Sequence, residues 1–207
     1  MRLKPGRPDI GRYVDRFDVP AATGAWGVVE SAMTGGLEVG QVYTDVLSPA
    51  LRRIGERWER GEIDIAEEHR ASGIATRIVG RLGSRAVRRG RARGTIVLGS
   101  PPGEHHALVV AMLADLLRLE GWDVCDLGAD TPSESFRHVL STMEGVDALG
   151  LSVTDERCLD SCAATCRLLR DAGVSVPIIL GGLAIRDHAH AIELGAVVVD
   201  EAHCISA

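Results

Sequence analysis

The chain has few aromatic residues, a single lysine and no long apolar segment, and these shortages exclude several classes of protein. Aromatic side chains make up 3% of the 207 residues. No run approaches the roughly 20 apolar residues that span a bilayer, so we expect no membrane partner. Residues 1–8 contain no apolar core, which argues against a signal peptide. Lys4 is the only lysine among 23 basic residues, which indicates a compositional bias.

The net charge limits the partners that the chain can bind, and the number of cysteines indicates the cellular compartment. With a formal net charge of −6, the chain has no electrostatic reason to bind nucleic acid, so we expect no direct contact with DNA or RNA. Five cysteines are an odd number in a chain long enough to form its own core, which indicates free thiols in a reducing cytoplasm. The length is sufficient for two small domains.

The first half of the sequence predicts a four-helix bundle. Pro49 lies inside an apolar helical pattern and is expected to kink it. Asp64 and Glu67 have the spacing of a capping box for a following helix, which ends at Gly83. The expected helices cover residues 20–33, 37–59 and 64–83, with a short one near Arg12.

Seven arginines between Arg77 and Arg93 mark the expected junction between domains. We interpret them as a solvated helix end followed by a linker; an anion site that meets ligand carboxylates is the alternative. The sequence then divides into an N-terminal extension (1–19), a helical-bundle cap domain (20–90) and an α/β domain (91–207).

From Thr95 onward, short apolar runs alternate with amphipathic helices. This pattern predicts an α/β fold class, in which the bundle is followed by a flavodoxin- or Rossmann-like, five-stranded parallel sheet with helices on both faces. Ligands of such sheets bind beyond the carboxyl ends of the strands, where the strand order switches. The expected strands are 95–98, 123–127, 148–153, 177–180 and 196–199.

Small, polar and imidazole side chains follow three of these strands and predict a pocket at that edge. His106 lies in a loop rich in proline and glycine, and Glu104 is placed to hydrogen-bond one imidazole nitrogen while the other binds a metal. The pair His105 and His106 also fits a helix cap, but the switch-point position favours a ligand role. The other candidates at this edge are Ser152, Thr154, Gly181 and Gly182.

The loop after the first strand lacks the spacings that bind phosphate. It contains neither G-x-G-x-x-G nor Gly-Lys-Ser/Thr, so a nucleotide cofactor is not expected. Gly99, Pro101, Pro102 and Gly103 instead form a wide loop that suits a bulky ligand.

The bundle contributes its own candidates, Trp58, Glu68 and His69. Glu68 lies on the apolar stripe of its helix, so its carboxylate needs a partner such as a ligand hydroxyl or a bundle arginine. Trp58 at the end of its stripe also fits plain core packing, but its pairing with Glu68-His69 favours a ligand.

Cys158, Cys162 and Cys166 recur every four residues on one helix. This spacing allows a metal cluster, yet it is also that of a buried stripe, and thiolate metal sites commonly use closer pairs in loops. We therefore expect core packing. His188 and His190 have no obvious partner in the sequence.

These motifs resemble those of a known family. The α/β half resembles cobalamin-binding domains, whose patterns Asp-x-His-x-x-Gly, Ser-x-Leu or Ser-x-Thr, and Gly-Gly correspond to residues 104–109, 152–154 and 181–182. The helical half resembles the bundle of CarH-type photoreceptors, whose signature of Trp, nine residues and Glu-His is matched by Trp58, Glu68 and His69. The resemblance covers nearly the whole chain from about residue 20.

This resemblance implies cobalamin as the cofactor, in its adenosyl form, with His106 as the lower cobalt ligand. It implies that Trp58 and Glu68 enclose the adenosyl group, with Glu68 accepting from its ribose hydroxyls. Green or blue light would break the cobalt–carbon bond and change the arrangement of domains or oligomer. The photocobilins, stand-alone relatives with biliverdin as a second chromophore, are a subgroup in which arginines 77–93 would pair with the bilin propionates.

Four features depart from that family pattern. Glu104 replaces the Asp of the first motif and Val109 its Gly. Glu59 follows Trp58, where CarH-type photoreceptors can place a histidine that captures cobalt after photolysis. About nineteen residues precede the bundle, too few for a winged-helix DNA-binding domain, so we expect signalling through a homo-oligomer or a regulatory protein partner.

The leading hypothesis is a light-responsive cobalamin sensor, which is not an enzyme. The alternative is a corrinoid carrier that shuttles methyl groups between methyltransferases and also joins a helical bundle to this α/β domain. The Trp58…Glu68-His69 motif favours the sensor, because a carrier must expose its upper face to partner enzymes. A domain that has lost its cofactor is a third interpretation, which the intact His106 opposes. A mutase is not expected without a barrel domain.

Overall fold

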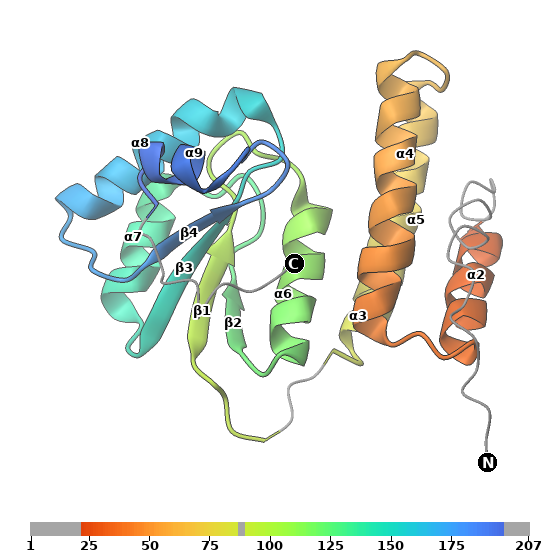
Figure 1. Cartoon of the computed structure of the whole chain (residues 1–207), viewed down its shortest axis with the longest axis horizontal. Coiled ribbons are helices and arrows are strands. Elements are labelled where there is room, and N and C mark those ends of the chain that lie inside the picture. Colours follow the sequence, from red (N-terminus) through yellow and green to blue (C-terminus); the bar gives the residue numbers. More distant parts are fainter. Residues whose placement is uncertain (1–21, 87–89, 197–207) are drawn as a thin grey trace. The chain divides into compact units, whose positions relative to one another are not determined.

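The computed structural model describes residues 22–86 and 90–196, and the chain divides between residues 87 and 88 into two compact units. The described part of the first unit is helical, and the second unit alternates strands with helices (Figure 1). No helix among the described residues is long and apolar enough to cross a membrane.

Three helical segments form the described part of the first unit. They are α2 (Ala22–Thr34), a continuous segment made of α3 (Val39–Gln41), the π-helix η1 (Val42–Leu47) and α4 (Ser48–Glu59), and α5 (Ile65–Gly83). The predicted capping box is confirmed, since Asp64 Oδ1 accepts from the Glu67 amide at 2.8 Å and Glu67 Oε2 accepts from the Asp64 amide at 3.2 Å. The predicted short helix near Arg12 lies outside the described residues.

A π-helical turn takes up the disturbance expected at Pro49. Pro49 lies in the first turn of α4, directly after η1. The Ser48 amide donates to the Tyr43 carbonyl, five residues back, as in a π-helix. Proline has no N–H to donate, and its ring crowds the carbonyl four residues earlier, so a widened turn accommodates it.

The second unit contains a parallel sheet with the order β2-β1-β3-β4. Its strands are β1 (Thr95–Gly99), β2 (Asp123–Asp126), β3 (Val146–Ser152) and β4 (Ile178–Gly181). The chain leaves β1 toward β2 on one side and returns to β3 on the other, which makes β1 and β3 the switch point. The described sheet thus has four strands where five were predicted, and residues 197–199 of the fifth run lie outside the described residues.

Helices cover both faces of this sheet. They are α6 (Ala107–Leu119), α7 (Ser133–Thr142), α8 (Leu159–Asp171) and α9 (His188–Glu193) (Figure 1). Side chains alternate along β1, so Ile96 and Leu98 pack with α6 in one core while Val97 packs with α7 and α8 in another. Both cores support the strand ends at which the candidate residues lie.

Candidate functional site

The structure brings the predicted residues of the α/β unit to one edge of the sheet. The loop from β1 to α6 carries Glu104 and His106, and the loop that follows β3 begins with Val153 and Thr154. Ser152 pairs in register with Gly181, so the ends of β3 and β4 are neighbours. The carboxyl ends of three strands therefore contribute to one region, as parallel pairing requires.

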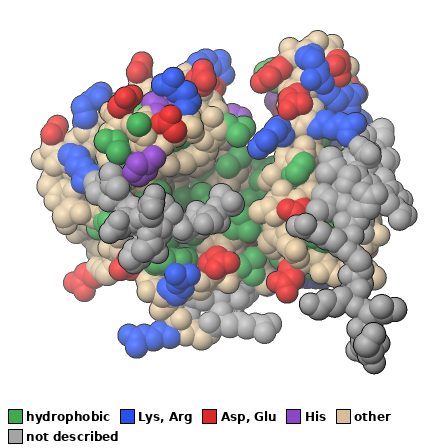
Figure 2. Space-filling model, viewed as in Figure 1, with side chains coloured by type: hydrophobic (Ala, Val, Ile, Leu, Met, Phe, Trp, Pro, Cys, Tyr) green, Lys and Arg blue, Asp and Glu red, His purple; other side chains and the backbone are tan. Residues whose placement is uncertain are grey.

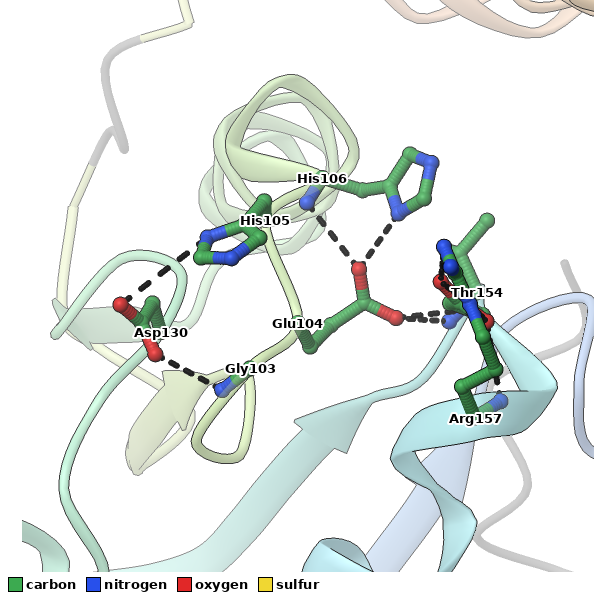
Figure 3. Close-up of polar contacts among 8 residues, drawn as sticks. Gly103, Glu104, His105, His106, Asp130, Thr154 and Arg157 are labelled. Atoms are coloured by element: carbon green, nitrogen blue, oxygen red, sulfur yellow. Dashed lines mark hydrogen bonds and ion pairs between the residues drawn. The ribbon is translucent and has the colours of Figure 1, made fainter.

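Glu104 is the buried centre of this edge. Its Oε1 accepts from the His106 amide at 3.1 Å and lies 2.5 Å from His106 Nδ1 (Figure 3). Its Oε2 accepts from the amides of Thr154 at 2.6 Å and Asp155 at 2.8 Å. Because the side chain is fully buried, these four contacts replace the water that a carboxylate would otherwise require.

The same contacts keep Glu104 ionised. Burial alone would raise the pKa of Glu104, but the hydrogen bonds from Asp155, His106 and Thr154 outweigh burial and hold its pKa below the usual range. An ionised carboxylate beside Nδ1 favours the imidazole tautomer that carries its proton there. The lone pair of the neutral ring then lies on Nε2, the nitrogen that does not contact Glu104.

His106 presents this second nitrogen at the surface. Its side chain is half exposed, and the residue occupies the N-cap position of α6 without making a side-chain capping bond. His106 therefore occupies the predicted cap position, but its imidazole does not cap the helix. His105 is more exposed, and its Nδ1 lies 3.9 Å from Asp130 Oδ2.

Two acidic residues at this edge were missed by the sequence reasoning. Asp155 donates its amide to Glu104, and hydrogen bonds from Arg157 lower the pKa of its own carboxyl to about 2. Asp130 follows β2 and contacts the loop that carries Glu104. Applying the strand-end argument to the second predicted strand, as was done for the other three, would have found Asp130. The recorded contact of Thr154 uses its backbone, whereas its hydroxyl had been predicted to act.

The two glycines after β4 differ in their surroundings. A Cβ at Gly182, where φ is +111°, would lie 2.2 Å from the Val153 carbonyl oxygen. A Cβ at Gly181 would meet no atom within 4 Å. The fold itself therefore requires Gly182, while Gly181 leaves open space into which a ligand can approach.

The side chains at this edge fit a metal ion whose other ligands come from a cofactor. A neutral imidazole oriented through its other nitrogen by a carboxylate is a common ligand arrangement for transition metals. Among residues 22–86 and 90–196, no group of three or more His, Cys, Asp or Glu side chains is arranged to hold a metal ion. A cobalt ion held in a macrocycle, which needs one axial protein ligand, fits His106 better than a bare ion.

The candidates of the helical unit are more exposed and have short-range contacts. Trp58, near the end of α4, is 46% exposed, so core packing within its own unit does not explain it. Glu68 is half buried, and its Oε1 accepts from Ser72 Oγ at 2.6 Å. His69 is exposed, with Nε2 3.8 Å from Glu68 Oε2. Glu59 is also exposed.

Comparison with known families finds a match in each of the two units. The profile described as B12 binding domain matches residues 94–203, and a second profile of the same description matches residues 21–82. The chain belongs to the B12-binding family. Cobalamin binding is thus the function that the α/β edge and the family match share.

Relatives of this B12-binding chain are of two kinds. The HTH-type transcriptional repressors CarA and CarH of Myxococcus xanthus are 31% and 32% identical, over 95% and 77% of this chain. This chain covers 68% of CarA but 52%, about half, of CarH. The dimethylamine corrinoid protein of Methanosarcina barkeri is 28% identical over 82% of this chain and 80% of its own length.

A solved structure confirms the fold class. The monomethylamine corrinoid protein of Methanosarcina barkeri aligns with a TM-score of 0.80, covering 90% of this chain and 89% of its own. At 18% sequence identity, this likeness shows the fold alone.

Two arginines of the predicted junction each contact an aromatic ring of their own unit in this B12-binding chain. Arg81 stacks over the Trp26 ring at 3.7 Å, and Arg93 lies 5.1 Å from the Trp122 ring. In the loop between α4 and α5, Arg60 pairs with Glu62 at 2.7 Å. Figure 2 shows acidic and basic side chains interspersed where these two helices meet. Arg88 and Arg89 lie outside the described residues.

The three spaced cysteines pack in the core beneath the site, as predicted. Cys158, Cys162 and Cys166 are buried in the cluster between the sheet, α7 and α8. Burial, with the nearby carboxylates, raises the pKa of Cys158, and a hydrogen bond with Cys166 together with burial raises that of Cys162. Both shifts favour the protonated forms of Cys158 and Cys162, and protonated thiols are poor metal ligands. His190, which had no partner in the sequence, accepts from the Arg186 amide through Nδ1 at 3.2 Å.

Proposed function

We propose that this chain is a light sensor that uses adenosylcobalamin and that His106 ligates the cobalt through Nε2. The observation that carries the ligand assignment is the contact of 2.5 Å between His106 Nδ1 and the buried Glu104 carboxylate. That contact holds a proton on Nδ1 and leaves Nε2 of the half-exposed side chain as the ligating nitrogen. Bound adenosylcobalamin supplies a visible chromophore and a light-sensitive cobalt–carbon bond.

In this proposal, the helical unit recognises the upper face of the cofactor. Trp58 offers a large exposed aromatic surface, which a flat or sugar-bearing group would remove from water. Glu68 has one oxygen engaged by Ser72 Oγ and retains the capacity to accept from a ligand hydroxyl. His69 adjoins Glu68 in the same motif.

The output of the sensor is proposed to be a change of assembly. Light that alters the upper face would release the contacts of Trp58 and Glu68, and the helical unit would be free to change its partner. That partner is a second copy of this chain or a regulatory protein. The relationship to CarA and CarH supports a regulatory role over a catalytic one.

The decisive experiment loads the protein with adenosylcobalamin in the dark and records its absorption spectrum before and after green light. Size-exclusion chromatography of both samples reports assembly. We expect a bound spectrum that converts on illumination, together with a change in elution. A spectrum that does not convert, or an elution volume that stays the same, would contradict the sensor.

Variants separate the two faces of the cofactor. His106→Ala should weaken affinity about 10- to 100-fold or leave a spectrum without the imidazole ligand, whereas the exposed His138→Ala on α7 serves as control. Trp58→Ala should reduce the preference for adenosylcobalamin over methylcobalamin or change the photolysis rate, and Trp58→Phe should retain part of both. Unchanged spectra and affinity in His106→Ala would refute the ligand assignment.

A corrinoid carrier of a methyltransferase system is the second candidate. The dimethylamine corrinoid protein, 28% identical over 80% of its length, favours it. A carrier should bind methylcobalamin and adenosylcobalamin with similar affinity and keep its assembly in light. It should also exchange a methyl group with a corrinoid methyltransferase, which the sensor should not.

A bilin as second chromophore remains a separate prediction. Its propionates would need cations near the junction between the units, where arginines 77–93 were expected to meet them. Protein purified in the presence of biliverdin should then show a far-visible absorption band. Without that band, the bilin is excluded and the cobalamin proposal is unaffected.

A further inference from the structure

Asp130 has an unusual backbone conformation for its residue type. It lies in the loop between β2 and α7, and its φ is +50°. Among residues 22–86 and 90–196, it is the only non-glycine residue in the left-handed region. Asp is tolerated there better than most residues, but glycine adopts this conformation without strain. Glycine would therefore suffice if this position only had to form a turn, so the presence of a carboxylate side chain needs another explanation.

The side chain and the backbone of Asp130 both contact the loop that carries His106. Its amide donates to the Glu104 carbonyl at 2.8 Å, and its Oδ1 accepts from the Gly103 amide at 2.7 Å. Its Oδ2 lies 3.9 Å from His105 Nδ1. Figure 3 shows the carboxylate of Asp130 directed at this loop, although more than half of the side chain is exposed.

These contacts complete a two-sided hold on Glu104. On one side, Asp130 from the β2–α7 loop binds the peptide groups of Gly103 and Glu104. On the other side, the amides of Thr154 and Asp155 bind the Glu104 carboxylate. Glu104 is thus fixed at its backbone and at the tip of its side chain, and it contacts the proposed cobalt ligand through His106 Nδ1.

We propose that Asp130 is a positioning residue for the cobalt ligand, which acts through Glu104 by holding the Gly103 amide and the Glu104 carbonyl, the two backbone groups on either side of the Gly103–Glu104 peptide. This inference rests on the proposed ligation by His106. Asp130 itself touches neither the metal nor His106. With its left-handed backbone, Asp130 offers its amide to the Glu104 carbonyl and its carboxylate to the Gly103 amide.

Three variants test the proposal in the full-length chain. Asp130→Gly keeps the backbone conformation and removes the carboxylate. Asp130→Asn keeps an oxygen that can accept from Gly103 and is also tolerated in the left-handed region. Asp147→Ala is the matched control, because Asp147 is likewise exposed and accepts the Thr95 amide at 2.8 Å, but at the opposite end of β1.

The first readout uses adenosylcobalamin and methylcobalamin as probes, with affinity and absorption spectrum measured in the dark. We expect Asp130→Gly to bind about 10-fold more weakly and to shift toward a spectrum without imidazole ligation. Asp130→Asn should restore most of both, and Asp147→Ala should keep the wild-type spectrum. A purely structural role would instead lower the melting temperature of Asp130→Gly and leave the ligation spectrum unchanged, which would overturn the proposal.

The second readout needs no cofactor. Amide hydrogen exchange at Gly103 in the apoprotein should be at least about 10-fold faster in Asp130→Gly than in Asp147→Ala, because only the former loses the acceptor of that amide. Equal exchange rates would refute the hold on the loop. If His106→Ala leaves the cobalamin spectrum of the wild type unchanged, the ligand assignment fails by itself, and this exchange measurement still decides whether Asp130 holds the loop.

Discussion

The two units of the chain prepare their candidate residues in different ways. In the α/β unit, Glu104 is buried and receives contacts from two loops that are distant in sequence, which carry Asp130 and the amides of Thr154 and Asp155. In the helical unit, the partners of Glu68 are Ser72 and His69, within one turn of the same helix. One site is fixed by tertiary structure, and the other presents side chains whose positions depend on local contacts.

Under the proposed function, this difference matches two roles: the α/β unit holds the metal, and the helical unit releases its contacts on a signal. A ligand side that must hold a metal at a defined distance gains from a preorganised imidazole. A side that must release its contacts on a signal gains from exposed groups that are ordered by the ligand itself. The following predictions, from the largest expected effect to the smallest, are designed to break or sharpen that contrast.

Removing the central carboxylate should have the largest effect. Glu104→Ala leaves buried backbone donors and the His106 ring without an acceptor, which should lower the free energy of unfolding by about 3–5 kcal/mol. Glu68→Ala is the matched change in the helical unit, and it should cost less than about 1 kcal/mol, because Glu68 is still partly exposed and its partner Ser72 lies on the same helix. Urea unfolding of both variants provides the measurement. Equal losses would remove the contrast between the units.

A methyl group at the second glycine of the pair should be nearly as harmful. Gly182→Ala places a Cβ 2.2 Å from the Val153 carbonyl oxygen at a φ of +111°, so it should destabilise the α/β unit by about 2–4 kcal/mol. Gly181→Ala has open space and should keep stability within about 1 kcal/mol while weakening cobalamin binding. Thermal unfolding with cobalamin titration distinguishes the two. A stable Gly182→Ala protein would refute the structural requirement.

The stability contributed by Glu104 should decrease in acid. Its folded-state pKa lies below the ordinary glutamate value of 4.5, so the ionised form is favoured by folding. Its contribution is therefore complete above that value and is lost as the pH falls through the lower, folded-state pKa. Urea unfolding between neutral and acidic pH should show the wild type approaching Glu104→Gln as the pH decreases. A difference that stays constant with pH would contradict the ionised state of Glu104.

Replacing a core thiol should have the smallest effect. Cys162→Ser puts a hydroxyl in a fully buried position next to Cys166, with an expected cost of about 1–2 kcal/mol and unchanged cobalamin loading. Cys125→Ser, at a partly buried position in β2, is the control for a less demanding environment. Loss of loading in Cys162→Ser at full stability would reopen the metal-cluster interpretation.

Much of the fold and the centre of the candidate site could be predicted from the sequence. The apolar runs of β1 to β4, the capping box at Asp64 and the contact between Glu104 and His106 all follow from periodicity or short spacings. Asp130 and the Asp155 amide could not be read from local spacing, because they reach Glu104 from 26 and 51 residues away through the topology of the sheet. The different roles of Gly181 and Gly182 could be distinguished only from the position of the Val153 backbone in the folded chain.

The π-helical turn before Pro49 has a consequence for the direction in which Trp58 faces. A π-turn accommodates one more residue than an α-helical turn, and each residue of an α-helix advances the side-chain direction by about 100°. Tightening Val42–Leu47 to α-helical geometry without deleting a residue would therefore rotate every later side chain of α4 by about that angle relative to α3. Trp58 would then face a different quarter of the helix circumference. The azimuth of the aromatic side chain is in this sense set about three turns earlier, by the length of a single widened turn.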